Sequence, residues 1–214
     1  MYSHMKRAQA SSLSPRKIPS QVRSAVTVEV ILEAAIHVLL ANGFDKMSTT
    51  RIAERAGVSV GSLYQYFPNK RALLSALVRL HVARVADRAE QACAGAHGAT
   101  LQKMCETVVN AFIDAKTERV DISRALYLPA ALAGGEAIVK AQSERVRKAF
   151  KTMLETASDI TVKQPDVASA VLVSAVVGPV QVALESGADA AQISQLRVHL
   201  TDLCVGYLRE INRH

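Results

Sequence analysis

The residues best suited to recognition chemistry lie between residues 59 and 66, in the run SVGSLYQY. Ser62 and Gln65 can donate and accept hydrogen bonds at base edges, and Tyr64 can offer its phenol to a phosphate or its ring to a thymine methyl. Gly61 has no side chain, so a helix that carries it can approach a nucleic-acid backbone closely. The run indicates DNA recognition, with an ordinary helical hairpin as the alternative.

Two short helical patterns position this run, and they meet at a glycine. Apolar residues at helical spacing predict a first helix from about Thr49 to Ala56, with Ser48 or Thr49 as its N-cap. Gly57 ends this helix, because glycine takes a positive φ at no steric cost. Ser59 caps a second helix almost at once, an arrangement typical of a helix-turn-helix.

The second helix is expected from Val60 to Phe67, with Val60, Leu63 and Phe67 facing inward. Its flanks and outer face then carry the hydrogen-bonding residues described above. Pro68 stops the helix, because proline cannot continue it and restricts the residue before it.

Asn69 caps a further helix that begins with Lys70 and Arg71. Two cations at a helix N-terminus oppose the macrodipole. Their presence indicates that an anion, such as a DNA phosphate, lies nearby. The alternative is a pair of solvated side chains.

The whole pattern T-x-x-I-A-x-x-A-G-V-S-x-G-x-L-Y-x-Y-F-x-N-K, from Thr49 to Lys70, resembles the DNA-binding signature of the TetR family of bacterial transcriptional regulators. The resemblance is sharp over about residues 27 to 80, and beyond them only the layout is similar. It implies a homodimeric, all-helical repressor with a small-molecule pocket in each C-terminal domain. Matched residue by residue, it implies DNA contacts by Thr49, Thr50, Ser59, Gly61, Ser62, Tyr64, Gln65, Tyr66 and Lys70.

Basic residues gather in the N-terminal part of the chain, which has a net charge of +7. Through Arg84, 12 Lys and Arg stand against 4 Asp and Glu, whereas 14 stand against 15 in the remainder. The basic excess therefore belongs to the part that holds the helix-turn-helix, as expected for binding to a polyanion. A membrane surface would attract the same charge, but no broad apolar face lies opposite these residues.

Cys93, Cys105 and Cys204 are widely spaced and match no zinc pattern with the histidines. We expect reduced, inert thiols in a cytoplasmic protein, with a redox-sensing Cys105 as the alternative. The sequence contains no Ser-His-Asp or Cys-His signature, no glycine-rich phosphate loop and no metal-ligand cluster. It therefore predicts no catalytic residues, no metal site and no cofactor, and an enzyme is the disfavoured class.

Half of the residues are hydrophobic but only 4% are aromatic, which favours close-packed helices over a β-sandwich. The predicted fold is all-α: an N-terminal three-helix DNA-binding domain and a C-terminal helical domain for ligand binding and dimerisation. The expected divisions are a flexible basic arm over 1–24, the helix-turn-helix domain over 25–72 and the effector-binding domain over 73–214. The arm is either a disordered tail or a segment that reaches a DNA groove.

Hydrophobic periodicity predicts the remaining helices. The head begins with a helix from Thr27 to Asn42, closed by Gly43, after which Phe44 is expected to fill the core of the head. Later helices are expected over residues 70–92, 101–117, 122–128, 136–157, 166–186 and 189–209, the third of them ending before Pro129.

The last two helices, about 166–209, are expected to pair antiparallel and to form the homodimer interface. They carry more apolar surface than one small domain can cover, although burial within the monomer is the alternative. Val167 to Leu184 is uncharged for 18 residues, a marginal length for a membrane span that Pro179 and Gln181 interrupt. We expect no membrane association.

Candidates for an effector cavity share apolar or hydrogen-bonding side chains on the inner faces of the later helices. They are Met104, Val108, Phe112, Tyr127, Leu128, Phe150, Met153, Ser174, Val177 and Gln181. Each is also a natural core residue. The scarcity of charge on these faces predicts a small, neutral, hydrophobic effector.

Together these features predict a ligand-responsive transcriptional regulator. In its simplest form it is a repressor that binds a palindromic operator in double-stranded DNA as a dimer and is released by the effector. The alternative is a DNA-binding protein without a small-molecule effector.

Overall fold

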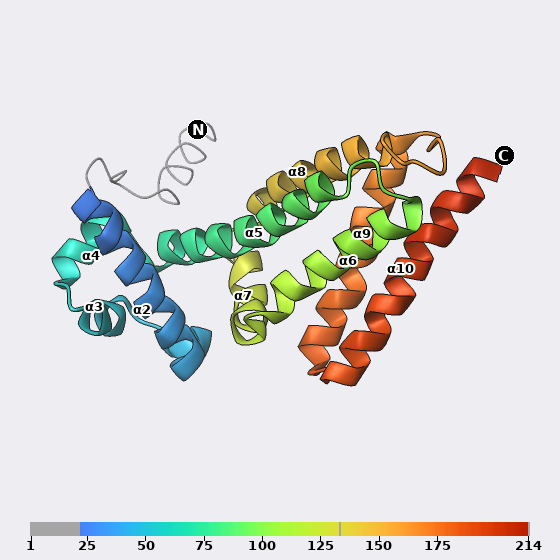
Figure 1. The fold of residues 1–214 in the computed structure, drawn as a ribbon. Coiled ribbons are helices and arrows are strands. Elements are labelled where there is room, and N and C mark those ends of the chain that lie inside the picture. The colour runs from blue at the N-terminus through green and yellow to red at the C-terminus, as the bar shows by residue number, and fades with distance from the viewer. Residues whose placement is uncertain (1–21, 133, 214) are drawn as a thin grey trace, which may run out of the picture. The chain divides into compact units, whose positions relative to one another are not determined.

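Helices make up the regular structure of the residues that the computed structural model describes, 22–132 and 134–213, and no strand occurs among them. In chain order (Figure 1) the helices are α2 Val22–Lys46, α3 Thr49–Ala56, α4 Val60–Tyr66, α5 Lys70–Gly95, α6 Leu101–Thr117, α7 Val120–Leu132, α8 Glu136–Leu154, α9 Pro165–Ser186 and α10 Ala190–Arg213. The all-α prediction is confirmed. The expected basic arm falls almost wholly outside the described residues.

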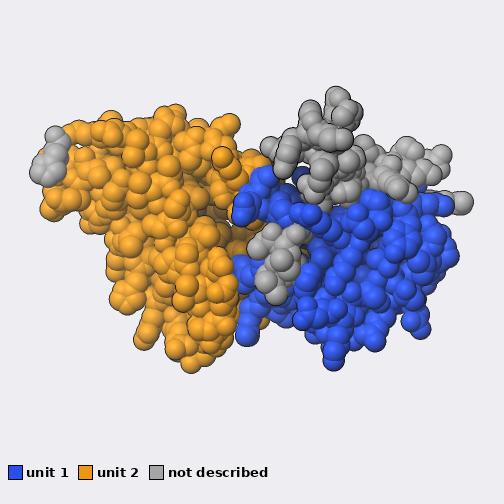
Figure 2. All heavy atoms as spheres, turned by 180° about the vertical axis from the view of Figure 1, so that it is seen from behind, with its two compact units in different colours: residues 1–81, 121–138 blue, residues 82–120, 139–214 orange. Residues whose placement is uncertain are grey.

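The chain divides into two compact units (Figure 2). The first, which we call the head, holds the described residues up to His81 together with Asp121–Ile138. The second, the body, holds Val82–Val120 together with Val139–His214. The head therefore continues past the expected limit at residue 72, because the opening turns of the 26-residue helix α5 bury their leucines in it. A boundary between two units that falls inside one continuous helix cannot be recognised from the amino-acid composition.

Polar side chains fix the helix ends of the helix-turn-helix. The Ser48 and Ser59 hydroxyls accept hydrogen bonds from the third backbone amide beyond each of them, at 3.3 and 3.0 Å. The Asn69 side chain accepts from the Ala72 amide at 2.8 Å. Gly57 between α3 and α4 has φ 66°, as a left-handed C-cap requires. The predicted caps are confirmed, and α3 has the predicted bounds.

The head departs from prediction around Gly43, which has φ 74° and ψ 172° and interrupts α2. The chain beyond a non-helical glycine no longer follows the apolar stripe of the helix before it. Met47 is consequently buried, whereas Phe44 is only half-buried and does not fill the core. The core of the head is built on α2 to α5, from Ile31, Ala35, Leu39, Ile52, Leu63, Phe67, Leu73 and Leu77.

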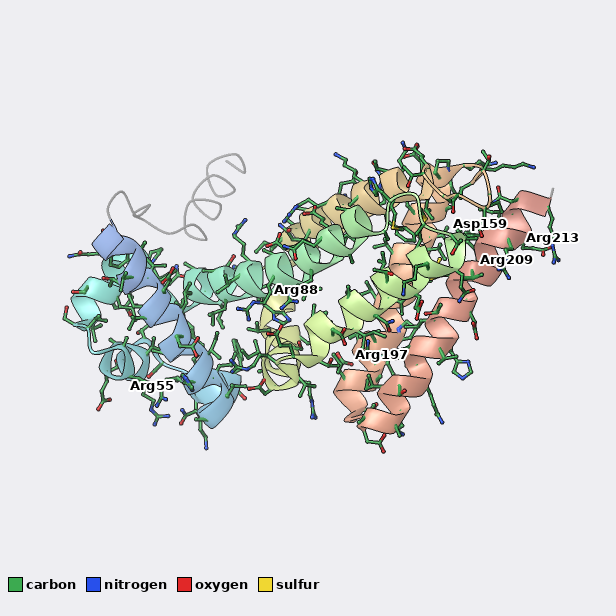
Figure 3. The ribbon with its side chains drawn as sticks, viewed as in Figure 1. Arg55, Arg88, Asp159, Arg197, Arg209 and Arg213 are labelled. Atoms are coloured by element: carbon green, nitrogen blue, oxygen red, sulfur yellow. The ribbon has the colours of Figure 1, made fainter. Side chains whose placement is uncertain are left out.

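In the body, α10 packs against both α6 and α9. Helices α9 and α10 run antiparallel (Figure 1) and are joined at Gly187, which has φ 77° and caps α9. Arg197 of α10, labelled in Figure 3, donates to the Asn110 carbonyl of α6 at 3.2 Å and to Asp114 Oδ1 at 2.5 Å. The predicted antiparallel pair is confirmed, and the body's core also draws on α5, α6 and α8.

Some expected helix ends were wrong. α7 does not stop before Pro129 but continues to Leu132. Proline removes one amide donor and crowds the turn before it. Only the last residues of α7 follow Pro129, so the helix loses little by continuing past it. α8 ends earlier than expected, at Leu154, and α10 continues to Arg213.

Within the described part of the chain, two helices are apolar enough to cross a membrane by length and composition alone, over Ser24–Lys46 and Pro165–Ser186. This is weak evidence, because the core helix of a soluble protein passes the same test. Both helices contribute buried residues to a helical core, Ile31 and Leu39 in the head and Leu172 and Val180 in the body.

Candidate DNA interface and effector cavity

Helix α4 presents most of the predicted DNA-contacting residues outward. Ser59, Gly61, Tyr64 and Gln65 are exposed, while Leu63 on the opposite side is fully buried. Among the other predicted contacts, Thr50 is exposed and Thr49, Ser62, Tyr66 and Lys70 are partly exposed. The structure thus gathers the predicted residues around one short helix held from beneath by the head's core.

Gly61 lies in the first turn of α4 with no structural reason to be glycine. A methyl group added there would meet only the Ser59 hydroxyl, at an ordinary contact distance of 3.8 Å. Glycine within a helix is less favourable than alanine by roughly 0.5–1 kcal/mol. Packing inside the head therefore does not require glycine at this position.

Hydrogen bonds hold the outward side chains in place. Thr49 Oγ1 at the start of α3 shares a hydrogen bond of 3.1 Å with the Tyr64 hydroxyl. The hydroxyls of Ser59 and Ser62 lie 2.8 Å apart and also share one. Two helices and the turn between them thus present a preorganised polar surface, which lowers the entropy lost on binding.

Lys70 has a contact that the sequence did not suggest. Its ammonium donates to the Phe44 carbonyl at 2.6 Å and lies 4.2 Å from the centre of the Phe44 ring. This cation–π contact and hydrogen bond tie the first turn of α5 to the segment that follows Gly43. Because an ammonium has three donors, a phosphate contact by Lys70 stays a prediction.

Two further residues of the helix-turn-helix are exposed. Val60, expected to face inward, is 37% exposed, because a residue in the first turn of a helix has no preceding turn to pack against. An exposed apolar residue beside Gly61 is suited to a thymine methyl. Arg55 is also exposed and projects outward from α3 (Figure 3), and its place two residues before Gly57 was the available signal.

A cavity of about 120 Å³ lies within the body, between α5, α6, α8, α9 and α10. Its wall is mainly aliphatic. The lining residues are Val82, Val85, Ala86, Ala89, Cys105, Val108, Val109, Phe112, Lys116, Val139, Gln142, Ser143, Val146, Phe150, Leu172, Val173, Val176, Val177 and Cys204.

The structure brings together four of the sequence candidates for this cavity, Val108, Phe112, Phe150 and Val177. Met104 and Met153 are instead fully buried in the body's core. Ser174 is exposed and donates to the Ala170 carbonyl, and Gln181 donates to Glu185 on the same helix. Tyr127 belongs to the head, and the Leu128 side chain lies outside the described residues.

Sequence reasoning missed the polar part of the lining, which consists of Lys116, Gln142 and Ser143 together with two thiols. Lys116 stands near the end of α6, where a cation is favoured by the helix dipole, so its position suggested a surface residue. The signal available was its spacing: Cys105, Phe112 and Lys116 follow one face of α6 at intervals of seven and four.

All three cysteines are free and buried. Burial raises the pKa of Cys93 to about 12 and that of Cys204 to about 11, and it raises the pKa of Cys105 further still. A thiol with a raised pKa stays protonated and is a poor nucleophile. Among the described residues, no group of His, Cys, Asp and Glu is arranged to hold a metal ion.

These features define a class: a helix-turn-helix head with an outward polar helix, joined to a helical body that contains an apolar cavity. Residues 31–77 match the family model of bacterial regulatory proteins of the tetR family. Residues 100–208 match the model of the tetracycline repressor-like C-terminal domain. The chain belongs to the TetR family of DNA-binding transcriptional regulators, which are not enzymes.

Solved structures show the same fold. A TetR-family regulator from Mesorhizobium loti MAFF303099 superposes with a TM-score of 0.71 at 20% identity, over 89% of this chain and 98% of that chain. The fatty acid degradation regulator FadR from Bacillus halodurans superposes with a TM-score of 0.66 at 18% identity, over 90% of this chain and 98% of that chain.

Curated relatives match over shorter stretches. The fatty acid metabolism regulator protein of Bacillus subtilis is 34% identical over 61 residues, which are 28% of this chain and 31% of that protein. The class C tetracycline repressor protein of Escherichia coli is 45% identical over 49 residues, or 23% of this chain and 22% of the repressor. The chain thus spans less than a third of the length of either relative, so their ligands do not transfer to it.

Proposed function

We propose that this protein is a dimeric transcriptional repressor that binds a palindromic operator through α4 and is released by a small hydrophobic effector in the body's cavity. The observation that carries the proposal is the outer face of α4. It combines exposed hydrogen-bonding residues with Gly61, where a side chain would fit but none is present. That combination serves a helix that enters a DNA groove.

The proposed dimer interface is the outer face of α9 and α10. Large apolar side chains remain exposed there in the single chain, namely Val167, Val171 and Val182 on α9 and Val198 and Leu203 on α10. Gly178 and Gly206 lie on the same two helices with open space where a methyl group would be. An apolar face with small residues allows a second copy to approach closely, and α9 and α10 of two chains would form a four-helix bundle.

A two-fold dimer would present its two α4 helices to half-sites about 34–36 Å apart, or a multiple of that distance. An effector would act through the difference in its affinity for the operator-binding state and the released state. Phosphate contacts would make the operator affinity fall steeply as salt is raised. Such a regulator works in the cytoplasm, where the DNA lies.

Selection of bound sites from random duplex DNA at near-physiological salt tests this proposal. The full chain is expected to enrich a palindrome, and Tyr64→Ala to weaken or alter that enrichment because it removes the ring and hydroxyl of an exposed α4 residue. Gln102→Ala, a change of an exposed residue on α6, is the control and should leave the selected sequence unchanged. Equal enrichment by Tyr64→Ala and the full chain would count against α4 as the recognition helix.

A further inference from the structure

Helix α4, with the sequence VGSLYQY, carries no charged side chain. The most common specific contact to a base in DNA comes from arginine or lysine, whose donors match the two acceptors on the major-groove edge of guanine. Helix α4 cannot make that contact. Its outer face offers a DNA groove one amide, apolar side chains and hydroxyls, and this chemistry does not favour guanine.

The basic side chains of the helix-turn-helix lie on the helices before and after α4. Arg51 of α3 donates to the side-chain oxygen of Asn42 at 3.1 Å. Lys70 of α5 donates to the Phe44 carbonyl at 2.6 Å. Arg55 is exposed on α3, but the first helix of a helix-turn-helix crosses the DNA backbone, so its charge is placed for phosphates. Phosphate contacts position a protein on DNA but do not read its sequence.

Gln65 carries the one side-chain amide on α4, and it is exposed. Among the described residues, none hydrogen-bonds to this amide. An amide has an acceptor and donors side by side, and adenine presents a donor and an acceptor side by side in the major groove. Gly61 lies one turn earlier on the same face of α4 and has no side chain to keep a base pair at a distance. Gln65 is therefore suited to adenine.

Val60 and Tyr64 form a second exposed row on α4, four residues apart. The Tyr64 hydroxyl shares a hydrogen bond of 3.1 Å with Thr49 Oγ1, which fixes the ring beside the start of α3. Val60 has only methyl groups to offer. Among the bases of DNA, thymine carries a methyl group in the major groove, and apolar side chains contact it. The second row therefore favours A·T base pairs, as Gln65 does.

We propose that α4 reads A·T base pairs in each half-site, with Gln65 hydrogen-bonded to an adenine and Val60 against a thymine methyl group. The inference rests on the operator binding proposed above and names the bases that face α4. Gln65 discriminates by hydrogen bonding and Val60 by apolar contact, so separate substitutions test the two contacts.

Selection of bound sites from random duplex DNA by Gln65→Glu tests the hydrogen bonds. The carboxylate keeps the length of the side chain but only accepts, so it suits the amino group of cytosine and not adenine N7. The full chain should prefer adenine at one half-site position by at least about fivefold, and Gln65→Glu should select cytosine there. Gln102→Glu makes the same change at an exposed position on α6 and should select the same sequence as the full chain.

Deoxyuridine in place of thymidine tests the apolar contact, because it removes the methyl group and keeps the base pair's hydrogen bonds. In titrations of labelled operator DNA, the full chain should lose affinity by about fourfold for each methyl group that Val60 contacts. Val60→Ala should not show this loss. Val120 opens α7 as Val60 opens α4, and the two are 41% and 37% exposed, so Val120→Ala is the matched control and should keep the loss.

Three results would overturn the inference: G·C pairs at the positions that these α4 variants affect, an unchanged base preference in Gln65→Glu, or an unchanged deoxyuridine effect in Val60→Ala. Circular dichroism melts check that both variants fold, and both introduced residues are good helix formers. A full chain that selects a palindrome with other bases facing α4 loses only this inference. A full chain that enriches no sequence loses the proposed function as well.

Discussion

The candidate site of the head lies on its outer surface, whereas the candidate site of the body lies in its interior. In the head the buried residues hold the structure and the outward residues of α4 are free for recognition, so Leu63 and Tyr64 are neighbours with separate tasks. In the body the candidate site lies inside, and residues such as Phe150 and Leu172 both line the cavity and belong to the core. A substitution can therefore separate stability from function in the head but not in the cavity wall of the body.

This difference explains how the two parts tolerate change. A cavity wall can be rebuilt by volume changes that the surrounding helices absorb, and each rebuilding alters the ligand that fits. Helix α4 has only seven residues, and its caps and its one buried leucine fix its position, so it has no such freedom. The curated relatives cited above match this chain over only 49 and 61 residues, whereas the fold is shared over most of it.

The largest expected effect comes from shortening one buried leucine in the head and one in the body. Leu63→Ala and Leu172→Ala, both at fully buried positions, should each lower the free energy of unfolding by about 2–5 kcal/mol in urea melts. At a temperature where both variants are folded, only Leu63→Ala should also lose operator affinity. The space that this substitution leaves lies under α4. Equal losses of operator affinity in the two variants would erase the distinction between head and body.

The next effect tests the proposed interface of α9 and α10. Leu203 is 46% exposed in the single chain, and Leu203→Glu should shift the protein from dimer to monomer in sedimentation velocity. Operator affinity should fall at least about tenfold, because each half-site is then bound alone. Val120→Glu, which changes an exposed residue at the start of α7, is the control and should remain dimeric. If Leu203→Glu remained dimeric, the interface would not be the proposed face of α9 and α10.

Matched N-caps give a smaller effect. Ser59 caps α4 in the head and Thr100 caps α6 in the body, each through a hydrogen bond to a backbone amide three residues on. Ser59→Ala and Thr100→Ala should each lower the free energy of unfolding by about 1 kcal/mol. Ser59→Ala should additionally weaken operator binding, as measured by fluorescence anisotropy. A comparable weakening in Thr100→Ala would show that local stability, and not the α4 surface, limits binding.

The smallest effect is expected at the cysteines. Burial raises the pKa of all three thiols, so they stay protonated at pH 7.5 and should not react with a chromogenic disulfide reagent in the folded protein. The thiols should react when urea unfolds the chain. A moderate rise in pH alone should not make them react in the folded protein. Rapid reaction of Cys105 at neutral pH would instead favour the redox-sensing alternative.

The head was predictable to a large extent because its signals are local. Ser48, Gly57, Ser59 and Asn69 each fix a helix end through contacts within three or four residues, and such contacts can be read from spacing. The exposure of α4 follows from the same periodicity. The error at Phe44 arose beyond Gly43, where a glycine with positive φ removes the helical register on which the expectation relied.

The body was less predictable because its features depend on how distant helices meet. Helical periodicity identified Val108 and Phe112 on an inner face, but it did not distinguish the cavity from the core at Met104. Ser174 and Gln181 satisfy their hydrogen bonds within α9, which the sequence did not exclude. Lys116 was missed because a lysine in the last turn of a helix is ordinarily a surface residue.

Gly61→Ala tests whether the outer face of α4 recognises DNA. A methyl group fits at this position, so the variant should fold with stability equal to the native chain or up to about 1 kcal/mol greater. Gly95→Ala, also a helical glycine with open space around it, is the matched control. Gly61→Ala should lose operator affinity in a titration of labelled operator DNA, whereas Gly95→Ala should keep it. Native affinity in a folded Gly61→Ala protein would contradict close approach of α4 to DNA.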